Sequence, residues 1–156
     1  MHDEPASRDG RELFESAPLS HAVFRLARLH KSIAAQLLRD TGLRPGQELV
    51  LMTLWEQGPQ RLVDLVQTLD SDAPTMTRSI ARLEKAGLVT RSRSPLDGRA
   101  VIVRATEKSR SLRPQVDAAW ARLEQLTVGS ASAHRQVELL HSLEEIEESL
   151  GAADEI

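Results

Sequence analysis

The sequence predicts a mainly α-helical (α+β) protein in which amphipathic helices surround a single β-hairpin. Apolar residues recur at spacings of three and four along most of the chain, as in helices that pack on one face. Residues 89–104 instead read as two short strands around a tight turn. After a first helix, three more helical segments precede that hairpin, and the last of them lies directly before it. This order is typical of a winged helix-turn-helix with further helices at both ends.

The first helices are marked by their apolar faces and by the residues that end them. We expect one helix over residues 19–38, which the sequence DTGLRPG then ends and turns. Shorter helices follow over residues 47–58 and 61–70, the earlier one closed by Gly58 and Pro59. The second and third of the three helices before the hairpin, 61–70 and 72–86, are joined by only a few residues, which favours a helix-turn-helix arrangement.

A fourth helix is predicted over residues 72–86. Asp72 is a typical N-cap, and Pro74 suits the first turn because its missing N–H is not needed there. Gly87 ends the helix. This helix lies directly before the hairpin, which is the position of a recognition helix.

The hairpin is expected to pair residues 89–93 with residues 100–104. The dipeptide Asp97-Gly98 predicts a turn between them, because such turns favour a positive φ. A long helix should follow from Thr106, with Pro114 in its first turns or at a bend.

The last helix, expected over residues 134–150, completes a single domain of ordinary size. The predicted division of the chain is a flexible N-terminal arm (1–17), one domain (18–150) and an acidic tail (151–156). Within the domain, the winged helix-turn-helix covers about 45–105, and helices at about 18–40 and 106–150 are available for dimerisation.

Composition excludes several classes of protein. There is no cysteine, which excludes disulfides and thiolate metal sites, and no apolar run near the length of a membrane span. The N-terminus is polar and lacks the apolar core of a secretory signal, so we expect a cytoplasmic protein. No nucleophile elbow, phosphate loop or ligand cluster recommends an enzyme, a metal site or a cofactor.

Charge is distributed unevenly along the chain. The net charge is −3, yet residues 72–110 hold nine basic and four acidic residues, which makes this block +5. From Gln136 to the end there are seven acidic residues and no Lys or Arg. A basic block around the predicted recognition helix and hairpin indicates a nucleic-acid partner.

The predicted recognition helix has an apolar face and an opposite basic face. Its apolar face carries Met76, Ile80 and Leu83, while the opposite face carries Arg78, Arg82 and Lys85, with Thr75 near the helix start. A helix of this kind fits the DNA major groove, where Arg can bond guanine and Thr can bond phosphate. A solvated face with ordinary charges is the alternative interpretation.

The arginines of the hairpin favour the DNA interpretation. A narrow minor groove attracts Arg99, whose guanidinium Asp97 could orient by a charge-assisted bond. Arg91 and Arg93 point to one face of their strand and suit phosphates. The competing hypothesis is a winged-helix protein-interaction module without specific DNA binding.

The sequence TMTRSIARLEKAGLVTRSRSPLDGRAVIVRATEKSR resembles the multiple-antibiotic-resistance-regulator (MarR) family of bacterial transcription factors. Its pieces TR, LEKAGLV and DGR occur in the family's order and spacing, and GLRPGQELVLMTLWEQGP is similar to its second helix. The resemblance implies DNA contacts at Thr75, Thr77 and Arg78, and a wing-tip pair of Asp97 and Arg99. It also implies a homodimer that binds a palindromic operator in double-stranded DNA, most often as a repressor.

Two positions depart from the family pattern after the hairpin. Ala105 stands where Leu is usual, and Ser109 stands where Gly is common. We expect neither to affect the DNA contacts. The absence of cysteine excludes the family's peroxide-sensing branch.

A small aromatic or phenolic acid is the ligand that the resemblance implies. Its candidate contacts are His21, Arg25, Arg28, His30 and Trp55. The alternative is that the polar stripe is a solvated helix face or forms salt bridges at the rim of the dimer, and that Trp55 belongs to the core. This alternative is favoured, because polar helix stripes are usually solvated and a Trp on an apolar helix is usually buried. Helical spacing of His134 and His141 with nearby Glu residues is too common to predict a metal site.

Overall fold

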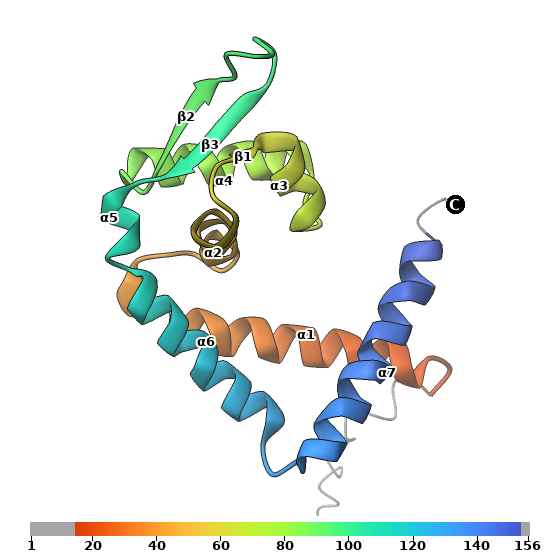
Figure 1. The fold of residues 1–156 in the computed structure, drawn as a ribbon. Coiled ribbons are helices and arrows are strands. Elements are labelled where there is room, and N and C mark those ends of the chain that lie inside the picture. The colour runs from red at the N-terminus through yellow and green to blue at the C-terminus, as the bar shows by residue number, and fades with distance from the viewer. Residues whose placement is uncertain (1–14, 154–156) are drawn as a thin grey trace, which may run out of the picture.

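The computed structural model describes residues 15–153. Its DNA-binding-type lobe contains α2 (Gln47–Gln57), β1 (Gln60–Arg61), α3 (Leu62–Thr68), α4 (Ala73–Lys85), β2 (Val89–Arg93) and β3 (Val101–Ala105). The arms contain α1 (Pro18–Leu37), the 3-10 turn η2 (Arg39–Thr41), α5 (Glu107–Arg110), α6 (Arg113–Val128) and α7 (Ala133–Ala152). Figure 1 shows the lobe above the arms, with the hairpin of β2 and β3 projecting from it. The predicted winged helix-turn-helix between flanking helices is confirmed.

The sheet is small and antiparallel, with the strand order β1-β3-β2. The central strand β3 places Val103 opposite both Gln60 and Arg91. The two-residue strand β1 was not predicted, because a segment so short leaves no alternating pattern in the sequence. It covers the edge of β3 and ties the start of α3 to the base of the hairpin.

The lobe is held together by one apolar core. Leu51 of α2, Leu65 of α3, Ile80 of α4 and Val103 of β3 are all fully buried in it. The predicted inward face of α4 is therefore confirmed, since Met76 and Leu83 are buried in the same cluster. Leu88 and Val89 continue this core into the hairpin, so packing sets where the wing leaves the lobe.

The arms carry a different kind of surface. The helix α1 packs along α6, where Ala34, Ala119 and Leu123 are buried. The helix α7 buries none of its residues in this single chain, and most of its apolar side chains lie exposed, with Ile146 half-buried. Within residues 15–153 no helix has the length and apolar character needed to cross a bilayer.

One long helix after the hairpin was predicted, and this prediction was wrong. The chain forms the four-residue α5, then bends at Ser111 and Leu112 before α6 begins. Pro114 lies in the first turn of α6, where its missing N–H breaks no helical bond. The proline therefore marks the start of a second helix, so that the arm begins with two separate helices, α5 and α6.

The ends of the fold agree with the sequence to within a few residues. The last helix extends to Ala152, so it includes the first residues of the predicted tail at 151–156. Most of the predicted flexible N-terminal segment, residues 1–17, and the last three residues lie outside the described residues.

Candidate nucleic-acid interface

The first turn of α4 is built around Asp72. Its Oδ1 accepts a hydrogen bond from the backbone N–H of Thr75 at 2.8 Å, and its Oδ2 accepts one from the Thr75 hydroxyl at 2.7 Å. The predicted N-cap is thereby confirmed. The bond from the Thr75 amide, reinforced by the hydroxyl, lowers the pKa of Asp72 below its usual value.

The polar residues at the start of α4 are oriented by this cap. Arg78 Nη2 donates to Thr75 Oγ1 at 3.4 Å, which forms a chain from Asp72 through Thr75 to the guanidinium. Thr77 donates its hydroxyl proton to the carbonyl of Ala73 at 2.8 Å and keeps its oxygen as an acceptor. Thr75, Thr77 and Arg78 are all exposed. Arg82 and Lys85 continue the exposed basic surface toward the end of α4.

The wing is attached to α4 by an ion pair that the sequence did not predict. Arg91 of β2 meets Glu84 of α4 at 2.9 Å, and the backbone N–H of Arg91 donates to the same carboxylate at 3.0 Å. Hydrogen bonding from the Arg91 side chain lowers the pKa of Glu84. Arg91 was predicted to meet phosphates; the structure gives it a protein partner, and the phosphate contact stays a prediction.

The tip of the wing is ordered by its own side chains. Arg93 Nη1 donates to the carbonyl of Gly98 at 2.9 Å, bracing the loop from the strand below. Asp97 Oδ1 accepts from the backbone N–H of Arg99 at 3.1 Å, whereas the sequence analysis expected it to bond the Arg99 guanidinium. Gly98 does not adopt the positive φ expected of it. The turn is set by Asp97, whose carbonyl accepts from the N–H of Ala100 at 3.0 Å.

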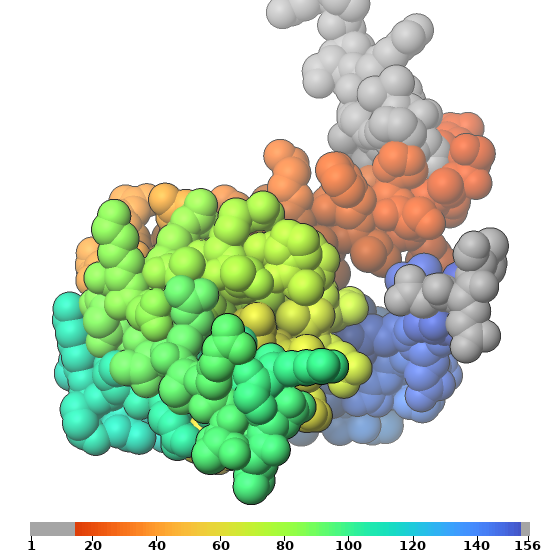
Figure 2. All heavy atoms as spheres, turned by 90° about the horizontal axis from the view of Figure 1, so that it is seen from above, coloured from red at the N-terminus to blue at the C-terminus, as the bar shows by residue number. Residues whose placement is uncertain are grey.

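The helix and the wing share one face of the molecule. Figure 2 looks onto this face, where α4 and the hairpin lie side by side and the hairpin projects beyond the helices. Asp97 and Arg99 also line a groove of about 250 Å³ between the wing and the start of α3, beside Arg61. The structure therefore places the two elements that carry the sequence-predicted residues side by side on one face.

The far end of α4 is held by α5. Lys108 donates to the carbonyl of Ala86 at 2.8 Å, and the Thr106 hydroxyl donates to the carbonyl of Gly87 at 2.7 Å. Both carbonyls follow the last turn of α4 and have no partner within that helix. The residues that begin the arm therefore close the recognition helix.

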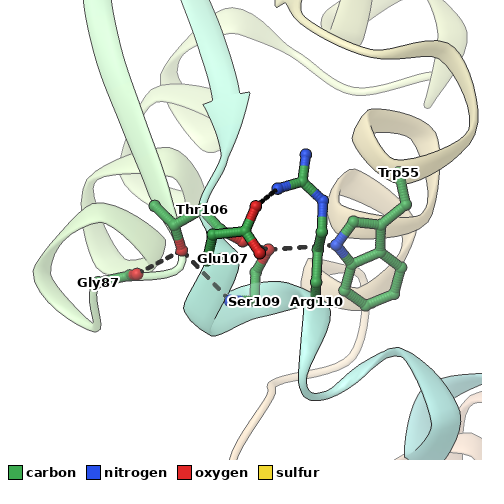
Figure 3. A network of polar contacts seen from close by, with 6 residues as sticks. All are labelled: Trp55, Gly87, Thr106, Glu107, Ser109 and Arg110. Carbon is green, nitrogen blue, oxygen red and sulfur yellow. Dashed lines mark hydrogen bonds and ion pairs between the residues drawn. The ribbon is translucent and has the colours of Figure 1, made fainter.

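Ser109 joins α5 to α2, as Figure 3 shows. Trp55 Nε1 donates to Ser109 Oγ at 3.1 Å, and Ser109 Oγ donates to the carbonyl of Thr106 at 2.7 Å. The Ser109 side chain is completely buried. This role of Ser109 was not predicted, because a bond across 54 residues leaves no local pattern in the sequence.

Comparisons with known proteins agree with this arrangement. A model of the MarR family matches residues 43–101, which cover the lobe from α2 to the start of β3. The structure of BpsR from Bordetella bronchiseptica superposes with a TM-score of 0.79 and 28% identity, over 85% of this chain and 95% of that one. Reduced AbfR bound to DNA superposes with a TM-score of 0.77 and 27% identity, over 91% and 96%.

The chain is similar to the MarR family over residues 43–101 and shares its fold. A relative by sequence is the HTH-type transcriptional regulator MgrA of Staphylococcus aureus, 34% identical over 93 residues. The match covers 60% of this chain and 60% of that regulator's length. These relatives are named as regulators and DNA-binding proteins, not as enzymes.

The residues that the MarR resemblance marked as ligand contacts lie in two places. His21, Arg25, Arg28 and His30 all belong to α1, where His30 meets the ring of Trp120 edge-on at 6.5 Å. Trp55 lies in the lobe, half-buried, with its N–H directed at Ser109 and Arg113 6.0 Å from its ring centre. Within one chain, the structure does not bring Trp55 and the α1 residues into a shared pocket among the cavities described for residues 15–153.

The histidines of α7 have carboxylate partners along the same helix. His134 lies 3.3 Å from Glu138, and His141 lies 3.2 Å from Glu145. Each is an exposed pair one helical turn apart, as is usual for side chains four residues apart on a helix surface.

We expect Asp72 to stabilise the lobe in a pH-dependent way. Asp72→Ala removes the acceptor for the Thr75 N–H and lowers the midpoint of urea unfolding at neutral pH. Because the folded pKa lies below the unfolded value of about 3.9, this stabilisation is fully present above that value and is lost as pH falls through the folded pKa. Unfolding curves of both proteins between about pH 7 and pH 3 measure the effect.

Asp72→Asn is the matched control, because Asn retains a cap acceptor without a titrating charge. A gap between wild type and Asp72→Ala that stays constant over this pH range would contradict the assignment.

Proposed function

We propose that this protein is a sequence-specific DNA-binding transcriptional regulator of the MarR family. The observation that carries the proposal is the shared face of α4 and the wing. Arg78 is oriented there by the Asp72 cap, and Arg99 stands at a braced wing tip. The DNA-bound AbfR structure supports it, since that protein has a similar fold at 27% identity.

The proposed docking follows from the shapes of the two grooves. The start of α4 enters the major groove, where Thr75, Thr77 and Arg78 reach base edges or phosphates. Arg82 and Lys85 lie farther along α4, where they contact the phosphate backbone of the DNA. The wing lies over the adjacent minor groove, where Arg99 meets the strongest negative potential.

We further propose that the protein acts as a homodimer on a palindromic operator. The helices α1, α6 and α7 leave large apolar side chains exposed, namely Leu19, Val23, Phe24, Leu26, Leu29, Leu126, Val137, Leu139, Leu140, Leu143 and Leu150. Apolar surface on this scale favours burial against a second copy. A two-fold dimer presents two recognition helices about 34 Å apart, which suits successive major grooves.

Repression relieved by a small anionic aromatic ligand completes the proposal. Occupying a promoter is sufficient to repress it. DNA binding of the neighbour BpsR is regulated by 6-hydroxynicotinic acid, an aromatic acid. On this chain His21, with Arg25 or Arg28, offers hydrogen bonds and charge to a carboxylate, and His30 lies on the same helix. Trp55 remains a candidate wall for the ligand through the exposed part of its ring.

A winged-helix module that binds another protein is the competing function. The exposed basic side chains of α4 and the wing argue against it, because a basic surface of this kind suits the phosphates of nucleic acid. Salt dependence separates the two functions, since DNA binding releases counterions and weakens steeply as salt rises.

Arg78→Ala and Arg99→Ala should each weaken binding to DNA from upstream of the protein's own gene. We expect a loss of about tenfold or more for each variant, and a salt dependence shallower by about one unit where a phosphate contact is lost. Fluorescence anisotropy at several salt concentrations, with unrelated DNA as competitor, gives both quantities.

Arg122→Ala is the matched control, because Arg122 is an exposed arginine of α6 that bonds Gln125 away from this face. Equal losses in all three variants would contradict the assigned interface. Failure of the wild type to bind any DNA at low salt would overturn the DNA function and favour the protein-interaction module.

Leu140→Glu should weaken the homodimer, because it places a charge on the apolar surface of α7. Sedimentation equilibrium should show a dimer for wild type and a shift to monomer for the variant. Glu145→Gln, at another exposed position of α7, serves as control. Dimers of unchanged stability in Leu140→Glu would exclude this surface from the interface.

Arg25→Ala and Arg28→Ala test the ligand. With 6-hydroxynicotinic acid as the probe, we expect release of wild-type protein from DNA, and loss of the response in at least one variant. The DNA affinity without ligand should stay near the wild-type value in both. An undiminished response in both variants would place the ligand elsewhere.

A further inference from the structure

The wing tip presents an apolar side chain whose role the interface has not yet explained. Leu96 is 97% exposed, the highest fraction among the large apolar residues described. It lies in the loop between β2 and β3. Figure 1 shows this loop at the end of the hairpin that projects from the lobe. The other strongly exposed apolar residues lie mainly on α1 and α7, which contribute to the proposed dimer surface, and Leu96 lies on neither helix.

The loop that carries Leu96 is held in place by several hydrogen bonds. Ser94 Oγ accepts from the backbone N–H of Leu96 at 3.2 Å and from that of Asp97 at 3.4 Å. The backbone N–H of Ser94 donates to the carbonyl of Ala100 at 2.8 Å, which closes the loop at its base. With the Arg93 bond to Gly98, these contacts hold the tip in a shape that points Leu96 outward.

The chemistry around Leu96 indicates what it meets. Arg93 and Arg99 flank it in the sequence, and both are exposed. A surface that suits this tip must therefore offer negative charge on either side of a narrow apolar region. The DNA minor groove does so, because phosphates line its rims while sugar and base edges line its walls and floor.

We propose that Leu96 inserts into the minor groove and pushes against a base step, which makes the protein sensitive to how easily that step deforms. The inference rests on the proposed DNA-binding function. Apolar wedges such as Leu partly unstack the step that they contact. Pyrimidine–purine steps open most easily, so Leu96 selects TA or CA/TG steps beneath the wing without a hydrogen bond to any base.

This role differs from that of Arg99, and the difference can be measured. An arginine on a phosphate or in a negative groove contributes through counterion release, which appears in the salt dependence. A leucine that displaces water from a groove contributes equally at all salt concentrations. The two neighbouring side chains therefore leave separate signatures in one binding experiment.

The experiment uses the full-length protein and a duplex of about 30 bp selected by this protein from random DNA. Leu96→Ala should bind it about tenfold more weakly than wild type, with an unchanged salt slope. Leu96→Met should bind like wild type, because Met keeps an apolar side chain of similar volume. Arg99→Ala is the contrasting variant, weaker and with a shallower salt slope. Thermal unfolding of Leu96→Ala should match wild type, since the side chain packs on nothing.

A second duplex series tests the sequence preference. The base step under the wing, located by footprinting, is changed from a pyrimidine–purine step to a stiff A-tract or G·C step. Wild type should lose affinity on the stiff duplexes, and Leu96→Ala should bind all of them alike. Fluorescence energy transfer between the duplex ends should show a smaller bend with Leu96→Ala.

The outcomes separate this inference from the proposed function. If the wild-type protein selects no specific duplex from random DNA, the proposed function as a sequence-specific regulator is wrong. If it selects one but Leu96→Ala binds it with wild-type affinity and the same step preference, the insertion of Leu96 is wrong and the proposed DNA-binding function is unaffected. A shallower salt slope in Leu96→Ala would also overturn the wedge, because it would mean that the change displaced the arginines.

Discussion

The recognition helix α4 is held by contacts at both ends and along its buried face. Asp72 binds the amide and the hydroxyl of Thr75 at the start, and Lys108 and Thr106 bind the carbonyls that follow the last turn. Between them, Ile80 is fully buried in the core of the lobe. The exposed basic face can therefore keep one orientation. Because little conformational freedom would then be lost on binding, this preorganisation would raise the affinity for a rigid DNA duplex.

The closing contacts of α4 also connect it to the arms. Thr106 and Lys108 belong to the segment that leads through α5 to α6, and Ser109 in that segment accepts a bond from Trp55 of α2. If the arm moved relative to the lobe, these hydrogen bonds would either break or pull α4 and α2 along with the arm. In the proposed dimer, this segment determines the separation of the two recognition helices, and hence the fit to successive major grooves.

Local patterns predicted most of the fold and placed the two groups of candidate DNA-binding residues on α4 and on the hairpin. Apolar spacing located the helices, and Asp72 with Pro74 located the start of α4 to within a residue. The break between α5 and α6 was missed, because Pro114 is compatible with either a bend or a new helix. The turn at Gly98 was predicted for the wrong reason, since Asp97 shapes it through hydrogen bonds to the backbone.

The sequence by itself determined which residues lie on which face of each element, because helical and strand periods place side chains by geometry alone. Only the tertiary structure decided which faces meet. The Glu84–Arg91 pair and the Trp55–Ser109 bond join elements whose relative positions depend on packing of the whole lobe. The outward direction of Leu96 likewise depends on how Ser94 and Arg93 fold the loop beneath it. Such contacts carry no periodic signal, since each depends on distances between separate elements rather than on spacing along one of them.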